Sequence, residues 1–115
     1  MKKLVYIIAS VALLISCESR TYEEISDQTP ITQQVKYNAD IKPIIDANCI
    51  SCHSANGPGP IQFTSYNLVK ANIDNILDRI QRPNGDPGKM PQGGSLSTSQ
   101  INIFIKWKAD GLNEN

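Results

Sequence analysis

One stretch of five residues, Cys49-Ile50-Ser51-Cys52-His53, constrains the fold of this 115-residue chain more than any other. It brings two thiols and an imidazole together, and His53 is the single histidine of the sequence. The remainder predicts a few short helices, and so small a helical unit usually needs a disulfide, a metal or a large cofactor for stability. We therefore expect this stretch to hold the folded unit together.

Apolar residues recur with helical spacing in three regions, and no region shows the alternation of a β-strand. A first helix is expected from a cap at Asn38 or Asp40, with Pro43 in its first turn, where a missing N–H costs nothing. A second helix is expected from about residue 65 to 81, because one face carries an apolar row: Val69, Ile73, Ile76, Leu77 and Ile80.

A third helix has the clearest start, because Ser97 and Gln100 predict a capping box. Gly111 is placed to end this helix. The sequence thus predicts an all-α domain over residues 37–115. The buried side of the third helix is expected to consist of Ile101, Phe104, Ile105 and Trp107.

The beginning of the chain is typical of an export signal. Lys2 and Lys3 precede an apolar stretch over residues 4–15, which is too short to span a bilayer and suits the core of a signal peptide. The stretch ends in Leu14-Ile15-Ser16-Cys17, which resembles the lipobox of bacterial lipoproteins. The resemblance implies that residues 1–16 are removed and that Cys17 is lipidated. An ordinary signal peptide with a chance cysteine is the alternative.

A lipid anchor at Cys17 places the protein in the bacterial cell envelope, held on a membrane and facing the periplasm. Residues 17–36 are predicted to be a flexible tether, with a short packed strand or helix as the alternative. The 11 basic and 11 acidic residues leave no net charge, which argues against binding to nucleic acid.

The pattern Cys-x-x-Cys-His is the attachment pattern of c-type haem. On one helical turn, the thiols of Cys49 and Cys52 both reach one edge of a porphyrin, and the imidazole of His53 points under the iron. A redox dithiol, a zinc half-site and a disulfide are the alternatives. A thioredoxin-like dithiol would follow a strand, and zinc would need four ligands, which residues 17–115 lack. One covalently bound haem c is therefore the expected cofactor.

Two segments make a family resemblance specific. Tyr37-Asn38-Ala39-Asp40-Ile41-Lys42-Pro43-Ile44-Ile45 leads into the motif, and Met90-Pro91-Gln92-Gly93-Gly94 precedes the third helix. Together they resemble small class I c-type cytochromes of bacterial cell envelopes, over most of residues 37–112. The resemblance implies a compact cytochrome c-like fold of about three helices around one haem. It also implies electron transfer between a redox donor protein and a redox acceptor protein.

Met90 is the candidate for the distal iron ligand, opposite His53. It is the one methionine that remains once residues 1–16 are removed. Seven of the twelve residues from 83 to 94 are Pro or Gly, which suits an irregular loop. Filling a gap in the core is the alternative role for this side chain. With both axial positions occupied by the protein, an electron carrier is expected rather than an enzyme.

The same resemblance implies that a proline carbonyl after the motif accepts the second ring N–H of His53. Pro60 is favoured and Pro58 comes next, although both are also ordinary turn residues. Some basic side chains are candidates for contact with haem propionates or for simple solvation: Arg79, Arg82 and Lys89.

Two further functions stay open at this point. One is a haem-containing sensor or a subunit of a larger redox complex. The other is a lipoprotein without haem that uses Cys49 and Cys52 as a dithiol or a disulfide.

Overall fold

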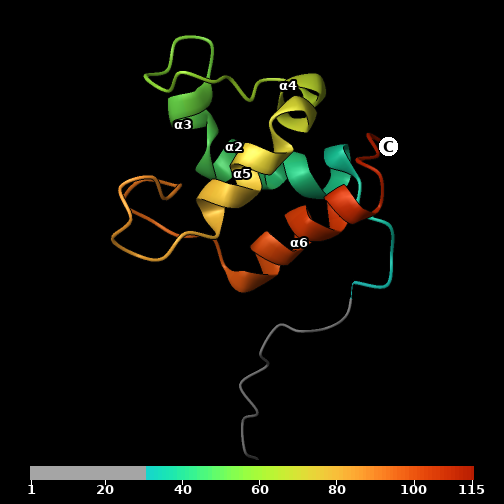
Figure 1. The fold of residues 1–115 in the computed structure, drawn as a ribbon. Coiled ribbons are helices and arrows are strands. Elements are labelled where there is room, and N and C mark those ends of the chain that lie inside the picture. Colours follow the sequence, from blue (N-terminus) through green and yellow to red (C-terminus); the bar gives the residue numbers. More distant parts are fainter. Residues whose placement is uncertain (1–30) are drawn as a thin grey trace, which may run out of the picture.

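The computed structural model describes residues 31–115, drawn as the coloured ribbon in Figure 1. Every regular element in this range is helical, which confirms the all-α prediction for the described residues. None of these helices is long and apolar enough to cross a membrane. The elements are the π-helical turn η1 (Tyr37–Ile41), α2 (Lys42–Asn48), α3 (Ile50–His53), α4 (Tyr66–Ala71), α5 (Ile73–Ile80) and α6 (Thr98–Ala109).

The predictions for the start of the chain concern residues outside this range. The predicted signal peptide (residues 1–16), the predicted lipidation site Cys17 and residues 18–30 of the predicted tether are not among the described residues.

The helices enclose one apolar core, in which α6 packs against both α5 and η1 (Figure 1). The rings of Tyr37, Tyr66 and Trp107 lie together, with centroids 5.4, 5.9 and 6.4 Å apart, and so join η1, α4 and α6. Each such aromatic pair adds about 0.5–1.5 kcal/mol to the burial of its surface. The core residues are Val35, Tyr37, Ile41, Ile44, Ile45, Phe63, Val69, Ile73, Ile76, Leu77, Ile80, Leu96, Phe104 and Trp107.

The folded domain reaches back beyond the predicted boundary at residue 37. Val35 is 2% exposed, and its N–H donates to Asp110 Oδ2 at 2.8 Å. Ile31 is partly buried against the core. Ile31 and Val35, which lie within the predicted tether, therefore pack against the domain. Two isolated apolar residues, Ile31 and Val35, are too few to show a periodicity, so the sequence does not reveal their burial. The partner of the Val35 backbone, Asp110, comes from the other end of the domain.

The first helical turn also begins earlier than its predicted cap. Helical backbone starts at Tyr37, after an extended Lys36, and Asp40 Oδ2 accepts the Lys36 N–H at 2.8 Å from within the turn. In η1 the N–H of Lys42 reaches back to the Tyr37 carbonyl, as in a π-helix. This wider turn accommodates Pro43, whose ring would clash with the carbonyl four residues earlier in a regular α-helix.

The expected second helix is two helices, α4 and α5, separated at Asn72. Its side-chain Nδ2 donates to the Leu68 carbonyl at 2.8 Å, and its N–H bonds to Val69 three residues back. Asparagine side chains compete for backbone partners in this way and so interrupt helices. The predicted apolar row nevertheless lies buried across both helices.

The predicted ends of α6 are confirmed. Ser97 Oγ accepts the Gln100 N–H at 3.2 Å, and Gln100 Oε1 accepts the Ser97 N–H at 3.0 Å. At the other end, Gly111 has φ +94°, and Leu112 N–H bonds to the Trp107 carbonyl at 2.9 Å, as in a Schellman motif. The expected burial of Ile105 is wrong, because its side chain is 43% exposed.

Candidate functional site

The motif lies on a single helical turn directly after α2. Cys49 N–H donates to the Ile45 carbonyl at 2.8 Å, and the Cys49 carbonyl accepts the N–H groups of Cys52 and His53 at 3.2 and 2.9 Å. Cys49 packs against the core, Cys52 is exposed, and both are free thiols. The turn therefore presents two thiols and one imidazole from adjoining positions of the backbone.

The ring of His53 is held on two sides. Its Nδ1 lies 2.5 Å from the Ile61 carbonyl oxygen, and its plane stacks on Phe63 with centroids 4.5 Å apart. A carbonyl oxygen only accepts, so Nδ1 carries the hydrogen in this contact. The neutral ring then has its lone pair on Nε2. A proximal iron ligand needs this tautomer and a fixed orientation.

The accepting carbonyl is that of Ile61, whereas the resemblance implied Pro60 or Pro58. The course of the loop explains this difference. Gly59 N–H donates to the Cys52 carbonyl at 2.8 Å, and Phe63 N–H donates to the His53 carbonyl at 2.8 Å. These two bonds fold the loop back onto α3 and bring the carbonyl of Ile61 to the imidazole.

Two glycines allow this close return of the loop, and neither was among the predicted site residues. A Cβ on Gly57 would lie 2.2 Å from the Cys52 carbonyl oxygen. A Cβ on Gly59 would lie 2.8 Å from His53 Nδ1 and 2.9 Å from its Cε1. The signal that pointed to them was the alternating Gly57-Pro58-Gly59-Pro60, which indicates a constrained loop but does not reveal which groups it approaches.

The environment of Cys49 disfavours this residue as the attacking thiol of a dithiol pair. Burial raises the pKa of the Cys49 thiol to about 11, since the charged thiolate loses hydration there. Reactive dithiols depend instead on a lowered pKa, because the thiolate is the attacking species. A neutral, partly buried thiol beside an exposed one suits attachment of a group that covers both.

Met90 lies in the loop between α5 and α6, where its side chain is partly buried. Its N–H donates to the Arg79 carbonyl near the end of α5 at 3.1 Å. In Figure 1 this loop and α3 both lie at the left of the view, away from the C-terminus. The loop encloses an open cavity of about 570 Å³, lined by its own residues at 84–87, 89 and 91–95. None of the three motif side chains lines that cavity.

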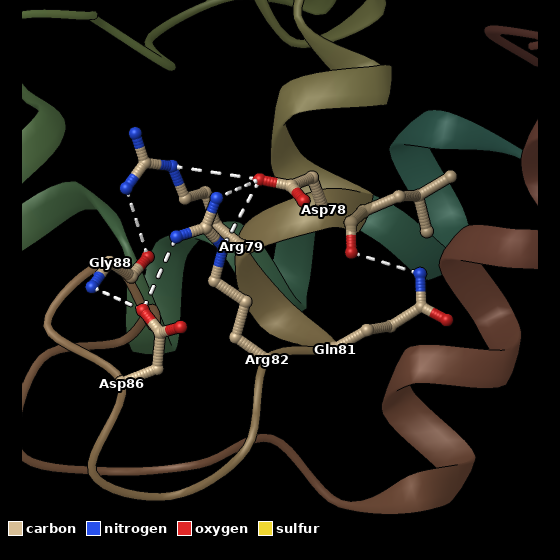
Figure 2. A network of polar contacts seen from close by, with 7 residues as sticks. Asp78, Arg79, Gln81, Arg82, Asp86 and Gly88 are labelled. Carbon is tan, nitrogen blue, oxygen red and sulfur yellow. Dashed lines mark hydrogen bonds and ion pairs between the residues drawn. The ribbon is translucent and has the colours of Figure 1, made fainter.

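A network of charged side chains fastens this loop to α5 (Figure 2). Arg82 Nη2 lies 2.7 Å from Asp78 Oδ2, and Arg82 Nη1 lies 3.2 Å from Asp86 Oδ1. Asp86 Oδ1 also accepts the Gly88 N–H at 2.6 Å, while Arg79 Nη1 donates to the Gly88 carbonyl at 3.1 Å. We name these five residues the Arg82 clasp. The Gly88 N–H and, after it, the Arg82 guanidinium hold the pKa of Asp86 below its usual range.

The clasp gives definite partners to the basic residues that were candidates for propionate contact or simple solvation. Arg79 and Arg82 bind the loop, and Lys89 Nζ donates to the Arg82 carbonyl at 2.6 Å. The residue that follows Lys89 is Met90, so this network lies directly beside the methionine backbone. The sequence signal was the four-residue spacing of Asp78, Arg82 and Asp86.

Comparison of the chain with protein-family models, with curated proteins and with solved structures finds no match in any of the three.

Proposed function

We propose that this protein is an electron carrier with one covalently bound haem c, tethered by a lipid to a membrane of the bacterial cell envelope. The orientation of His53 carries the proposal. Its Nδ1 is engaged by Ile61 at 2.5 Å while its ring is stacked on Phe63, which leaves Nε2 for a metal. The adjoining thiols of Cys49 and Cys52 match the two attachment points of the same cofactor.

Each residue has a distinct role in this proposal. Cys49 and Cys52 would form the two thioethers, and His53 Nε2 and Met90 Sδ would bind the iron. Haem c, when bound, supplies an iron that takes up and gives back one electron. A thioether ligand favours the reduced state and raises the potential relative to two histidines. Because His53 and Met90 would both bind the iron, oxygen and substrates would find no open position on it, which favours transfer over catalysis.

A denaturing gel stained for haem tests the proposal. Covalently held haem stays with the chain on the gel, so the mature protein, produced where cells attach haem, should stain at its own mass. Cys49→Ala/Cys52→Ala should remove the stain, while Ser51→Ala, a substitution between the two cysteines, should keep it. An unstained mature chain would overturn the proposal and favour the dithiol function.

The distal ligand has a separate test. Carbon monoxide binds ferrous haem that has an open axial position, so the reduced protein should bind it poorly and Met90→Leu should bind it readily. Gln92→Leu, two residues along the same loop, serves as the control and should behave like the unaltered protein. Rapid binding by the unaltered protein would remove Met90 as a ligand and favour a sensor with an open distal face.

A further inference from the structure

A run of 23 consecutive residues, 47–69, contains no Asp, Glu, Lys or Arg. It includes α3 and the loop leading to α4, which folds back onto α3 through the bonds at Gly59 and Phe63. The exposed Cys52 therefore lies within an uncharged segment that folds back on itself. We name six exposed residues of this region the neutral face: Ser51, Cys52, Asn56, Pro58, Pro60 and Gln62.

Charges elsewhere in residues 31–115 are mostly compensated in pairs. The pairs lie on α2, α5, α6 and the loop after α5, and they join Lys42 to Asp46, Arg82 to Asp78 and Asp86, Lys106 to Asp110, and Lys108 to Asp74. Paired opposite charges produce fields that fall off steeply with distance, and salt screens them further. The neutral face thus has no charge of its own, and the paired charges of the domain add little field there.

Charge decides which partners such a face accepts. Complementary charges raise association rates from about 10⁵–10⁶ to 10⁸–10⁹ M⁻¹s⁻¹ at low salt, and they set the orientation of the encounter. A charged partner surface laid on the neutral face would lose hydration without gaining an opposite charge. An uncharged partner surface incurs no such loss.

We propose that the neutral face is the surface on which this protein exchanges electrons, and that its partner is a redox protein with an uncharged docking surface. The inference rests on the proposed function, because Cys52 would bring one edge of the haem to this face. It predicts association that depends little on ionic strength.

Nitroxide probes of opposite charge measure the field at the face without any electron transfer. In the full mature protein with reduced iron, amide signals of Ser51, Asn56 and Gln62 should be broadened equally by cationic and anionic probes, within about twofold. Gln62→Lys should make the anionic probe the stronger one at these amides. A difference of about fivefold or more in the unaltered protein would overturn the neutrality of the face.

Electron transfer to hexacyanoferrate(III) tests whether this face is the one used. One electron leaves the ferrous protein, which becomes ferric, and hexacyanoferrate(III) becomes hexacyanoferrate(II). The matched variants are Gln62→Lys, which adds a positive charge, and Glu114→Gln, which removes a negative one, so each changes the net charge by +1. Glu114 adjoins the C-terminus, which Figure 1 shows on the other side of the view from α3.

The two variants should differ in rate. Gln62→Lys should speed the reaction several-fold at low ionic strength, on the order of tenfold for a trivalent anion, and salt should abolish the gain. Glu114→Gln should change the rate less than twofold. Equal effects of the two variants, or a larger effect of Glu114→Gln, would show that another face is used. Haem staining separates this outcome from failure of the proposed function, since a stained and reducible protein remains a carrier whichever face it uses.

Discussion

At the scale of single residues, the close approach of Gly59 to His53 is the tightest constraint on the candidate site. A Cβ there would lie under 3 Å from two ring atoms of the imidazole, so the ring or the loop has to move. Overpacking of this kind costs about 1–3 kcal/mol. The Ile61 contact at Nδ1 would be strained or lost, and with it the orientation of Nε2.

Gly59→Ala should therefore lower the thermal stability and shift the reduction potential of the haem protein. Thermal unfolding and a redox titration measure the two effects. Gly94→Ala is the matched control, because a Cβ at Gly94 meets nothing within 4 Å. Equal behaviour of the two variants would mean that Gly59 does not position His53.

Cys17 supports a second prediction at this scale, drawn from the sequence alone. Cys17→Ser removes the thiol that a lipid would modify, so the variant should lose membrane attachment or remain unprocessed. Its haem content should be unchanged, because Cys49 and Cys52 are intact. Fractionation of cells into membrane and soluble proteins checks the outcome, and a normally processed, membrane-bound variant would contradict the lipid anchor.

At the scale of elements, the Arg82 clasp connects α5 to the loop that contains Met90. Its ion pairs are partly exposed, so water and salt screen them and each contributes little on its own. They act together with backbone hydrogen bonds at Gly88 and Met90. Together these contacts connect α5 to a loop that has no regular structure. The clasp should matter more for the position of Met90 than for global stability.

Arg82→Ala should therefore speed hydrogen exchange at the Met90 amide, which donates to the Arg79 carbonyl, by about tenfold, and shift the reduction potential. Exchange in the buried part of α6, such as at Phe104, should change little. Lys42→Ala is the control, since it breaks an exposed pair with Asp46 on α2. Unchanged exchange at Met90 in Arg82→Ala would show that the loop holds its position without the clasp.

At the scale of the whole molecule, Asp110 joins the two ends of the domain. Its Oδ2 accepts the Val35 N–H at 2.8 Å, and its Oδ1 pairs with Lys106 Nζ at 2.9 Å. Beside it, the Tyr37 and Asn38 N–H groups donate to the carbonyls of Asn113 and Glu114. The Val35 N–H and then Lys106 hold the pKa of Asp110 below its ordinary value of 3.8.

A lowered pKa in the folded state means that the ionised carboxylate stabilises the fold at neutral pH. This stabilisation is complete above the unfolded-state pKa and is lost as the pH falls from about 4 through the lowered value. Asp110→Asn should lower the denaturation midpoint at pH 7 and flatten its fall in acid. Asp46→Asn, in an exposed pair, should change the midpoint little. Denaturant titrations at pH 7 and pH 3 make the comparison, and an unchanged midpoint for Asp110→Asn would contradict it.

Features that depend on near neighbours were determined by the sequence alone. Helical spacing identified the apolar row from Val69 to Ile80, and the Ser97–Gln100 pair predicted the start of α6, because both arise within one or two turns of chain. The spacing of Cys49, Cys52 and His53 likewise predicts their chemistry without reference to the fold.

Other features were decided by contacts between distant segments. The N–H of Val35 finds its acceptor in Asp110, 75 residues away and directly after α6. The accepting carbonyl at His53 is that of Ile61 because the loop returns to α3. The exposure of Ile105 depends on how α6 packs against α5 and η1, which no local pattern records. The sequence thus determined which groups carry the proposed chemistry, whereas the tertiary structure decided how they are held, because their supports come from segments that meet only in the folded chain.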